Sequence, residues 1–261
     1  MCGPTRLLVA LAFLTGIPGG SSMATDDAKS WDGTIVQYGT MHEAIGKQQH
    51  QGRVLLSELV ARPHFFGVAA LEKLEGEVTI HDGKVTITGV DSSGQLRPTE
   101  ESLLNRKATL LAGAYVPSWT AHTLSGPVGR DELDEAIAGA ASTAGLDTSK
   151  PFVFTVEGEF AGLGFHVING ACPMRARLQK TELPKSGHPF ESELEQVHGT
   201  IVGVFAAGAV GELTHPGTST HAHVLFQDKT SGKTVTGHVE WVRLNEGAVL
   251  RFPGIATQSS P

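Results

Sequence analysis

The chain has 261 residues, of which 40% are hydrophobic and 18% charged, and a formal net charge of −7 at pH 7. This length suits one large domain or two modest ones, and the hydrophobic content is that of a globular chain, which excludes a disordered or fibrous protein. The acidic balance, without clustered Lys and Arg, argues against a nucleic-acid partner, because phosphate binding needs such clusters. The 32 glycines and 13 prolines favour many short elements joined by turns, so we expect a β-rich fold.

The first residues have the pattern of an export signal. Arg6 precedes the apolar run LLVALAFLTGI, and the small residues after it suit cleavage near Ser22 or Ala24. We therefore expect residues 1–24 to be a signal peptide and the protein to be exported, either to the periplasm or into the medium. The apolar run is short for a transmembrane helix, so we expect no stable membrane span after cleavage. An uncleaved anchor is the alternative.

Cysteine usage points away from a disulfide-stabilised domain. Cys2 would leave with the signal, and the mature chain would keep only Cys172. No intrachain disulfide could then form, so the exported domain would depend on its core, with a bound metal ion as a further candidate.

Helical and strand patterns alternate through the first part of the chain. A helical patch is expected at residues 42–49 and a second helix from about Ser57. The segment EVTIHDGKVTI (77–87) alternates polar and apolar residues about an Asp-Gly pair, which predicts a hairpin. KATLLAGAYV (107–116) is a further predicted strand. A helix is expected within 129–145, with Asp131 as a candidate cap and a glycine stop.

The second part is predicted to be richer in strands. Residues 152–168, FVFTVEGEFAGLGFHVI, are predicted to form two strands about a Gly-rich bend. Residues 172–196 are polar and contain three prolines, so we interpret them as an excursion between the halves.

Three histidines fall on a second predicted hairpin. Residues i and i+2 of a strand share a face, so His221 and His223 point the same way. The turn signal KTSGK follows, and a turn centred on residues 230–231 sets His223 opposite His238 and His221 opposite Glu240. Directly paired side chains have Cβ atoms about 5 Å apart, close enough for imidazole nitrogens to meet at one ion.

The hydrophobic pattern selects the same register. A loop of odd length would turn His238 towards the apolar face of Val224 and expose the apolar side. Three neutral imidazoles match the open catalytic form of a zinc site, whereas a closed structural site would take a fourth ligand. Copper, nickel or iron could occupy such a site as well. The alternative is three imidazoles on the wet face of a hairpin, with no ion.

The order of these motifs resembles the alpha-acetolactate decarboxylase family. GTIVGVF followed by HAHVLF and, past the hairpin, GH is similar to the metal-binding half of that family. YGTMHEAIGKQQHQGRVLLSEL with LEGEVTIHDGKV is similar to its opening, and the resemblance runs from about Val36 to Leu244. It implies an α/β fold of the β-rich α+β kind, with a mixed sheet in residues 31–150 and a smaller sheet carrying the metal hairpin in residues 151–261. It also implies a homodimer.

The resemblance implies a site and an activity. His221, His223 and His238 match the family's zinc ligands, and Glu77 matches its active-site carboxylate. The implied substrate is a small 2-hydroxy-3-oxo acid, acetolactate, which loses carbon dioxide to give acetoin. A single open zinc can act as Lewis acid on the ketone and hydroxyl, and Glu77 is the candidate that protonates the carbanion. Without the resemblance, Glu77 would be interpreted as a solvated glutamate at a hairpin start.

The chain departs from the family on the substrate side of the site. His166 stands where the family has an arginine for the substrate carboxylate, and it could bind that carboxylate when protonated or become a fourth metal ligand. The loops before HAH and GH are longer, and the acidic C-terminal tail of the family is missing. Arg175 and Arg177 are candidates for the lost cation. His215 is a candidate accessory group, or simply an exposed loop residue.

Three hypotheses follow from the sequence. The first is an exported zinc-dependent decarboxylase of acetolactate. The second is an exported metal-binding protein of the same fold, with His166 as a further ligand and no decarboxylation. The third is a metal-dependent lyase for a related oxo acid.

Overall fold

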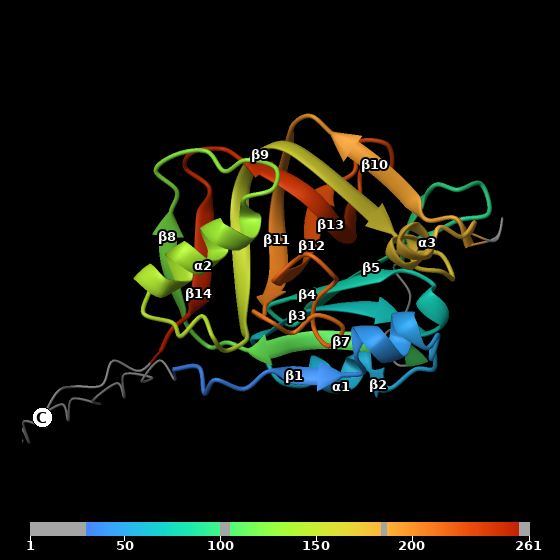
Figure 1. The fold of residues 1–261 in the computed structure, drawn as a ribbon, viewed down its shortest axis with the longest axis horizontal. Helices are drawn as coiled ribbons and strands as arrows, with labels where there is room; N and C mark the ends of the chain where they lie inside the picture. The colour runs from blue at the N-terminus through green and yellow to red at the C-terminus, as the bar shows by residue number, and fades with distance from the viewer. Residues whose placement is uncertain (1–29, 100–104, 184–186, 256–261) are drawn as a thin grey trace, which may run out of the picture.

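The computed structural model describes residues 30–99, 105–183 and 187–255, so the expected signal peptide lies outside the described part. That part contains two seven-stranded sheets with short helices at their margins, which confirms the strand-rich α+β class (Figure 1). Among the described residues, no helix is long and apolar enough to cross a membrane.

The first sheet has the strand order β1-β7-β3-β4-β5-β6, with β2 also paired to β7. Its strands are β1 (Val36–Tyr38), β2 (Val54–Leu55), β3 (Phe65–Leu71), β4 (Glu77–His81), β5 (Lys84–Val90), β6 (Leu96–Thr99) and β7 (Lys107–Tyr115). The helical pieces that accompany it are a π-helical turn (His42–Gly46), the one-turn helix α1 (Leu56–Leu59) and a 3₁₀ turn (Glu72–Leu74).

The predicted β4–β5 hairpin is confirmed. His81 pairs with Lys84, so the loop has two residues, and both Asp82 and Gly83 have positive φ, at 50° and 75°. Positive φ at both central positions is what a type I′ turn requires, and Asp-Gly supplies it at low cost. The strand predicted over 107–116 is likewise present as β7.

The second sheet has the order β11-β12-β13-β9-β14-β8, and β10 pairs with β9. Its strands are β8 (Trp119–Thr123), β9 (Phe152–Val167), β10 (Phe190–Leu194), β11 (Val197–Phe205), β12 (Thr220–Gln227), β13 (Thr234–Leu244) and β14 (Val249–Pro253). Because β11 pairs with β9 as well as with β12, the strands β9, β11, β12 and β13 close into a ring. β8 precedes residue 150 in the chain yet pairs with β14, so the two sheets do not part at that residue.

The glycines of residues 152–168 do not divide the segment into two strands as we expected, although β9 curves over along its length (Figure 1). The segment is one 16-residue strand, β9, whose first half pairs with β11 and whose second half pairs with β13 and β10. Glycine serves here for close approach: a Cβ on Gly164 would lie 2.0 Å from Trp241 Nε1. The prediction of two strands was wrong because a glycine that makes room for a neighbour looks the same in sequence as one that turns the chain.

Other expectations differ in detail from the structure. The strand pairings within the described part are antiparallel where we expected a mixed sheet, and consecutive strands such as β3–β4, β4–β5 and β12–β13 pair as hairpins, which requires antiparallel strands. The second sheet is not smaller than the first. Helix α2 (Leu133–Thr143) begins after Glu132, whose carboxylate accepts a hydrogen bond from Gly129 N, so the Asp131 cap was wrong. The polar excursion contains helix α3 (Pro173–Gln179).

The two sheets meet where β4 and β5 pack against β13. Thr79 Oγ1 of β4 lies 2.5 Å from Thr236 Oγ1 of β13, and Thr236 N donates to Thr88 Oγ1 of β5 at 2.9 Å. All three threonines are buried. These hydrogen bonds hold the start of β4 beside the β12–β13 hairpin. They therefore bring Glu77 of the first sheet close to the histidines of the second, and Figure 1 shows the two sheets in contact here.

Replacing Gly113 with alanine is expected to destabilise the fold by about 1–3 kcal/mol, because overpacking forces backbone shifts. Gly113 pairs with Gly67, and a Cβ on it would lie 2.4 Å from Phe66 O and 2.8 Å from Phe65 Cζ. Denaturant unfolding measures the change. Gly126→Ala is the control, since a Cβ there meets nothing within 4 Å. Equal stability of the two variants would contradict the packing argument.

Candidate active site

The hairpin gathers its three histidines as predicted. His223 pairs with His238 across the β12–β13 ladder, and the ladder continues to Gln227 opposite Thr234, which puts the turn centre where the sequence indicated. His221, His223 and His238 each offer a ring nitrogen within 4.8 Å of the others, and all three side chains are buried. The expected pairing of His221 with Glu240 is absent from the ladder of the described strands, because β13 bulges between Val239 and Trp241.

The ring of His223 is fixed by the first sheet. Its Nδ1–H donates to the carbonyl oxygen of Val78 at 3.0 Å, so Nε2 carries the lone pair. That Nε2 is buried and has no hydrogen-bond partner among the described residues. A buried nitrogen of this kind is normally paired, and an imidazole whose other nitrogen donates to a carbonyl has the tautomer and orientation of a metal ligand.

The cluster favours neutral imidazoles. Burial lowers the pKa of His223 to about 3, although its hydrogen bond to the Val78 carbonyl has the opposite effect. Burial, followed by repulsion from neighbouring imidazoles, also lowers the pKa values of His221 and His238 far below their usual range. A neutral imidazole is the form that binds a metal ion, so the cluster is ready for one at neutral pH.

Glu77 lies at the start of β4 with its carboxyl directed at this cluster. Its side chain is buried, with Oε2 3.6 Å from His223 Nε2 and Oε1 3.8 Å from His166 Nε2. Burial raises the pKa of Glu77 to about 8, and a backbone hydrogen bond from Ile168 only partly opposes this. Without a nearby cation the carboxyl therefore holds its proton at pH 7, as a general acid must. The solvated glutamate that the hairpin pattern alone would indicate is excluded.

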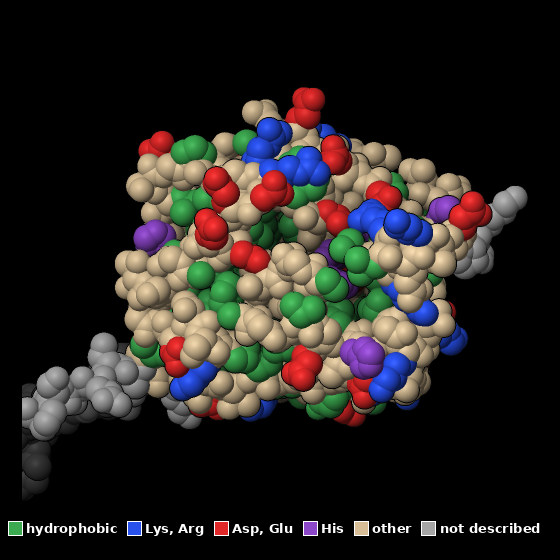
Figure 2. Space-filling model, in the orientation of Figure 1, with side chains coloured by type: hydrophobic (Ala, Val, Ile, Leu, Met, Phe, Trp, Pro, Cys, Tyr) green, Lys and Arg blue, Asp and Glu red, His purple; other side chains and the backbone are tan. Residues whose placement is uncertain are grey.

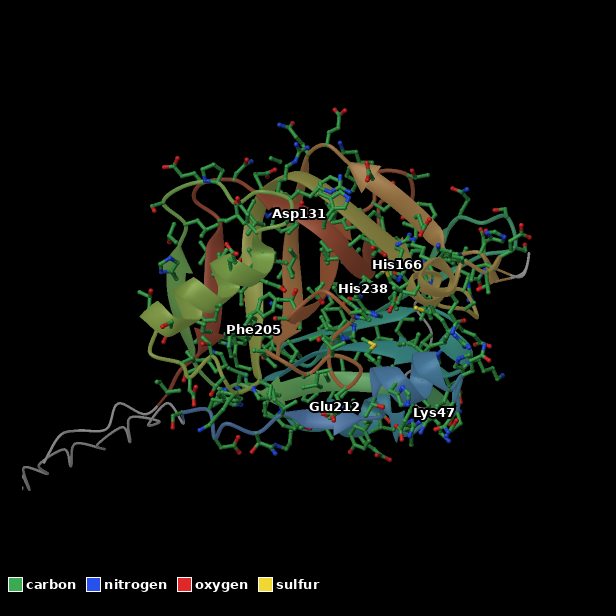
Figure 3. All side chains as sticks on the ribbon, viewed as in Figure 1. Lys47, Asp131, His166, Phe205, Glu212 and His238 are labelled. Carbon is green, nitrogen blue, oxygen red and sulfur yellow. The ribbon has the colours of Figure 1, made fainter. Side chains whose placement is uncertain are left out.

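His166 is engaged by two carboxyl groups. It pairs with His238 across β9 and β13, and its Nδ1–H donates to Glu240 Oε1 at 2.6 Å, while Nε2 faces Glu77. Figure 3 shows His166 and His238 next to each other where β9 and β13 meet. The three-histidine group that could hold a metal ion does not include His166. The sequence alternatives for His166 were a substrate clamp or a metal ligand, and in the structure its ring lies between the carboxyl groups of Glu77 and Glu240.

Glu240 is a site residue that the sequence argument placed on the hairpin face but did not connect to His166. Burial is the largest single influence and raises its pKa, but the hydrogen bonds and charge attraction of His166 and Arg177 together outweigh it, so the pKa of Glu240 is lowered. Arg177 Nη1 lies 3.2 Å from Glu240 Oε2, and Nη2 contacts Glu191. Arg177 is therefore neutralised by two carboxylates, while Arg175 donates to Gln179 at 3.2 Å.

A cavity of about 200 Å³ leads to the cluster. Figure 2 shows histidine side chains within a hollow on this face. His215, a candidate accessory group, lines the cavity with its ring 5.0 Å from that of His238, and burial lowers its pKa to about 4. Cys172 is buried and free, and burial raises the pKa of its thiol.

The metal-free protein is expected to lose stability as the pH falls from 6.5 towards 5. The folded-state pKa values of His221, His223 and His238 are lowered, so the unfolded chain binds more protons in this window and unfolding becomes easier. Each histidine contributes up to about 1.4 kcal/mol per pH unit. Glu77 has the opposite effect: its raised pKa makes the folded state more stable as the pH falls towards 4.5. This is one group, however, against three histidines. Urea unfolding in chelator at pH 7, 6 and 5 measures this, and a flat profile would contradict it.

Fold and site together define a class of protein. Two antiparallel sheets enclose three convergent imidazoles that could hold a metal ion, with the buried carboxyl of Glu77 beside them, which are the groups of a metal-assisted enzyme. The sequence profile of the family described as alpha-acetolactate decarboxylase matches residues 35–252, and the chain belongs to this family of carboxy-lyases. No curated protein matches the chain by sequence.

Solved structures share the fold. Alpha-acetolactate decarboxylase from Bacillus subtilis strain 168 has a TM-score of 0.62 at 19% identity, with 85% of this chain and 86% of that chain covered. A Staphylococcus aureus protein of unknown function, described as similar to alpha-acetolactate decarboxylase, has a TM-score of 0.56 at 15% identity and the same coverage. At these identities the likeness shows the fold, so the chemistry rests on the residues of this chain.

Proposed function

We propose that this protein decarboxylates acetolactate to acetoin and carbon dioxide with a zinc ion held by His221, His223 and His238. The observation that carries the proposal is the buried, unpartnered Nε2 of His223, which lies inside the three-histidine cluster and 3.6 Å from Glu77 Oε2. Such a lone pair is costly to bury unless a cation or donor meets it. Zinc with three histidines and an open position suits this donor set, although geometry alone leaves other transition metals open.

The residues divide the chemistry between them. When bound, zinc supplies a Lewis acid for the ketone and hydroxyl oxygens of the substrate. The bond to the carboxylate breaks, its electron pair stays on the carbon that bore the carboxylate, and carbon dioxide leaves. Glu77 holds the proton that this carbon then receives, which balances the reaction as acetolactate plus a proton to acetoin and carbon dioxide.

We propose His166 as a positioning residue for Glu77. Glu240 Oε1 accepts a hydrogen bond from His166 Nδ1–H at 2.6 Å, which fixes the ring so that Nε2 stays 3.8 Å from Glu77 Oε1. Arg177 in turn holds Glu240. This row of contacts, from Arg177 through Glu240 and His166, keeps the carboxyl of Glu77 beside the histidine cluster.

The test combines metal content with product formation. Protein purified without chelator is analysed for bound metals, and acetoin is then measured after addition of racemic acetolactate. Stoichiometric zinc with acetoin formation supports the proposal. Zinc without acetoin favours a metal-binding protein, or a lyase for a related oxo acid if another 2-hydroxy-3-oxo acid releases carbon dioxide. Absence of any bound metal would contradict all three functions: the acetolactate decarboxylase, the metal-binding protein and the lyase for a related oxo acid.

We also propose that the protein is exported and that residues 1–24 are removed. The support is the sequence pattern of Arg6, an apolar run and small residues. Mass spectrometry of the protein from its native host measures the mature N-terminus, and an intact Met1 would contradict cleavage. Sedimentation of the same sample tests the homodimer that family membership leads us to propose.

A further inference from the structure

The cavity above the histidine cluster has a single positive group on its wall. Among the described residues that line it, Arg130 is the one arginine or lysine, and it shares the lining with His215, His238 and Glu240. Arg130 lies on the segment before α2. In the view of Figure 3 its neighbour Asp131 lies above and to the left of His238, and both residues line the cavity.

Arg130 is held in place by an aromatic ring. Its guanidinium carbon lies 4.0 Å from the ring centroid of Trp241, which follows His238 by three residues on β13. Trp241 Nε1 donates to Glu193 Oε1 at 3.1 Å, and this oxygen forms an ion pair with Arg130 Nη2 at 3.7 Å, which is longer than a hydrogen bond. A guanidinium stacked on a ring is oriented while its N–H donors remain able to bind a planar anion in a bidentate manner.

The other basic groups near the site are already engaged. Arg177 contacts both Glu240 and Glu191, and both ring nitrogens of His166 face carboxyl groups. Asp131, Asp134 and Glu240 also line this cavity, and Glu77 lies behind it against His166 and His223. An anionic substrate therefore needs a cation at the outer end, where Arg130 is half exposed, with 52% of its side chain accessible.

We propose that Arg130 binds the carboxylate of the substrate at the mouth of the cavity and so selects 2-hydroxy acids over neutral hydroxyketones and diols. This assignment rests on the proposed function, because it takes the oxygens next to the carboxylate to face the histidine cluster. Arg130 then takes the place of the arginine that His166 replaces in the sequence. Trp241 orients the guanidinium of Arg130. Because Trp241 and His238 lie on the same strand, β13, the position of Arg130 is fixed relative to the histidine cluster.

The experiment compares two stable probes that differ in the carboxylate. The acid 2,3-dihydroxy-2-methylbutanoate and the neutral butane-2,3-diol are titrated into zinc-loaded protein by calorimetry. Arg130→Gln is expected to weaken binding of the acid about tenfold or more, as loss of a charge-assisted bidentate pair does. Binding of the diol should change less than about twofold, because the diol has no carboxylate for Arg130 to bind. The zinc content should also stay the same, because Arg130 is not one of the proposed ligands.

Arg243→Gln is the matched control. Arg243 lies on the same Trp241 ring at 5.7 Å, donates to Ala161 O and does not line the cavity, so both probes should bind as they do to the wild type. Equal effects of Arg130→Gln on acid and diol, no effect on either, or a wild type that binds neither probe would overturn the assignment. If the wild type shows the Arg130-dependent preference for the acid yet forms no acetoin, the proposed function fails and the anion site stands.

Discussion

His223→Ala is expected to remove the bound metal ion and, with it, at least about 10³-fold of the decarboxylation rate, since a metal Lewis acid contributes several kcal/mol to such a reaction. His223 is the ligand whose orientation the structure fixes most completely, through Nδ1 and the Val78 carbonyl. Two ligands from one hairpin would remain, too few for a stable zinc site. Metal analysis after gel filtration and acetoin formation from acetolactate measure the two effects.

The control for this prediction is His198→Ala. His198 lies on β11 of the same sheet, exposed and paired with Glu159 at 3.1 Å, so its loss should leave metal and activity unchanged. Because His223 is also a buried core residue, the folding of His223→Ala is compared with that of the wild type in chelator, where neither holds metal. A folded variant that keeps stoichiometric zinc would show that the cluster is not the metal site.

The hairpin could be predicted from sequence because its geometry is local. Strand alternation puts His221 and His223 on one face, and the turn centre then pairs His223 with His238, all within residues 220–244. The same logic found the β4–β5 hairpin. It did not find the bulge between Val239 and Trp241, since the strand that pairs with both sides of it, β9, is distant in the sequence.

The rest of the site depends on contacts between distant segments. Glu77 is buried only because β4 packs against β13, through Thr79 and Thr236, which are 157 residues apart in sequence. The pattern LEGEVTI contains no trace of that packing, so its local interpretation was a solvated glutamate. Glu240 similarly belongs to the site through His166, 74 residues earlier. Resemblance to a family supplied Glu77, but the link from His166 to Glu240 needed the three-dimensional structure.

Glu77→Gln is expected to lower the rate of acetoin formation by about 10²–10⁴-fold, the usual contribution of a general acid, while the protein keeps its metal. Glutamine has nearly the same shape and can still accept the backbone hydrogen bond from Ile168, but it has no acidic proton to give. Its amide also removes a carboxyl whose pKa burial raises to about 8, so the variant should be at least as stable as the wild type above neutral pH. Kinetics, metal analysis and urea unfolding are measured on one preparation.

Glu75→Gln is the control for the chemical change itself. Glu75 lies two residues away, is half exposed and faces Lys73 at 3.8 Å, so the same substitution is made outside the site. Full activity of Glu75→Gln beside a folded, metal-bound and inactive Glu77→Gln would place the proton on Glu77. If Glu77→Gln instead keeps its rate within about tenfold, less than 1.4 kcal/mol of barrier depends on the carboxyl, and water must protonate the carbon. In that case the raised pKa of Glu77 reflects only its burial between the two sheets.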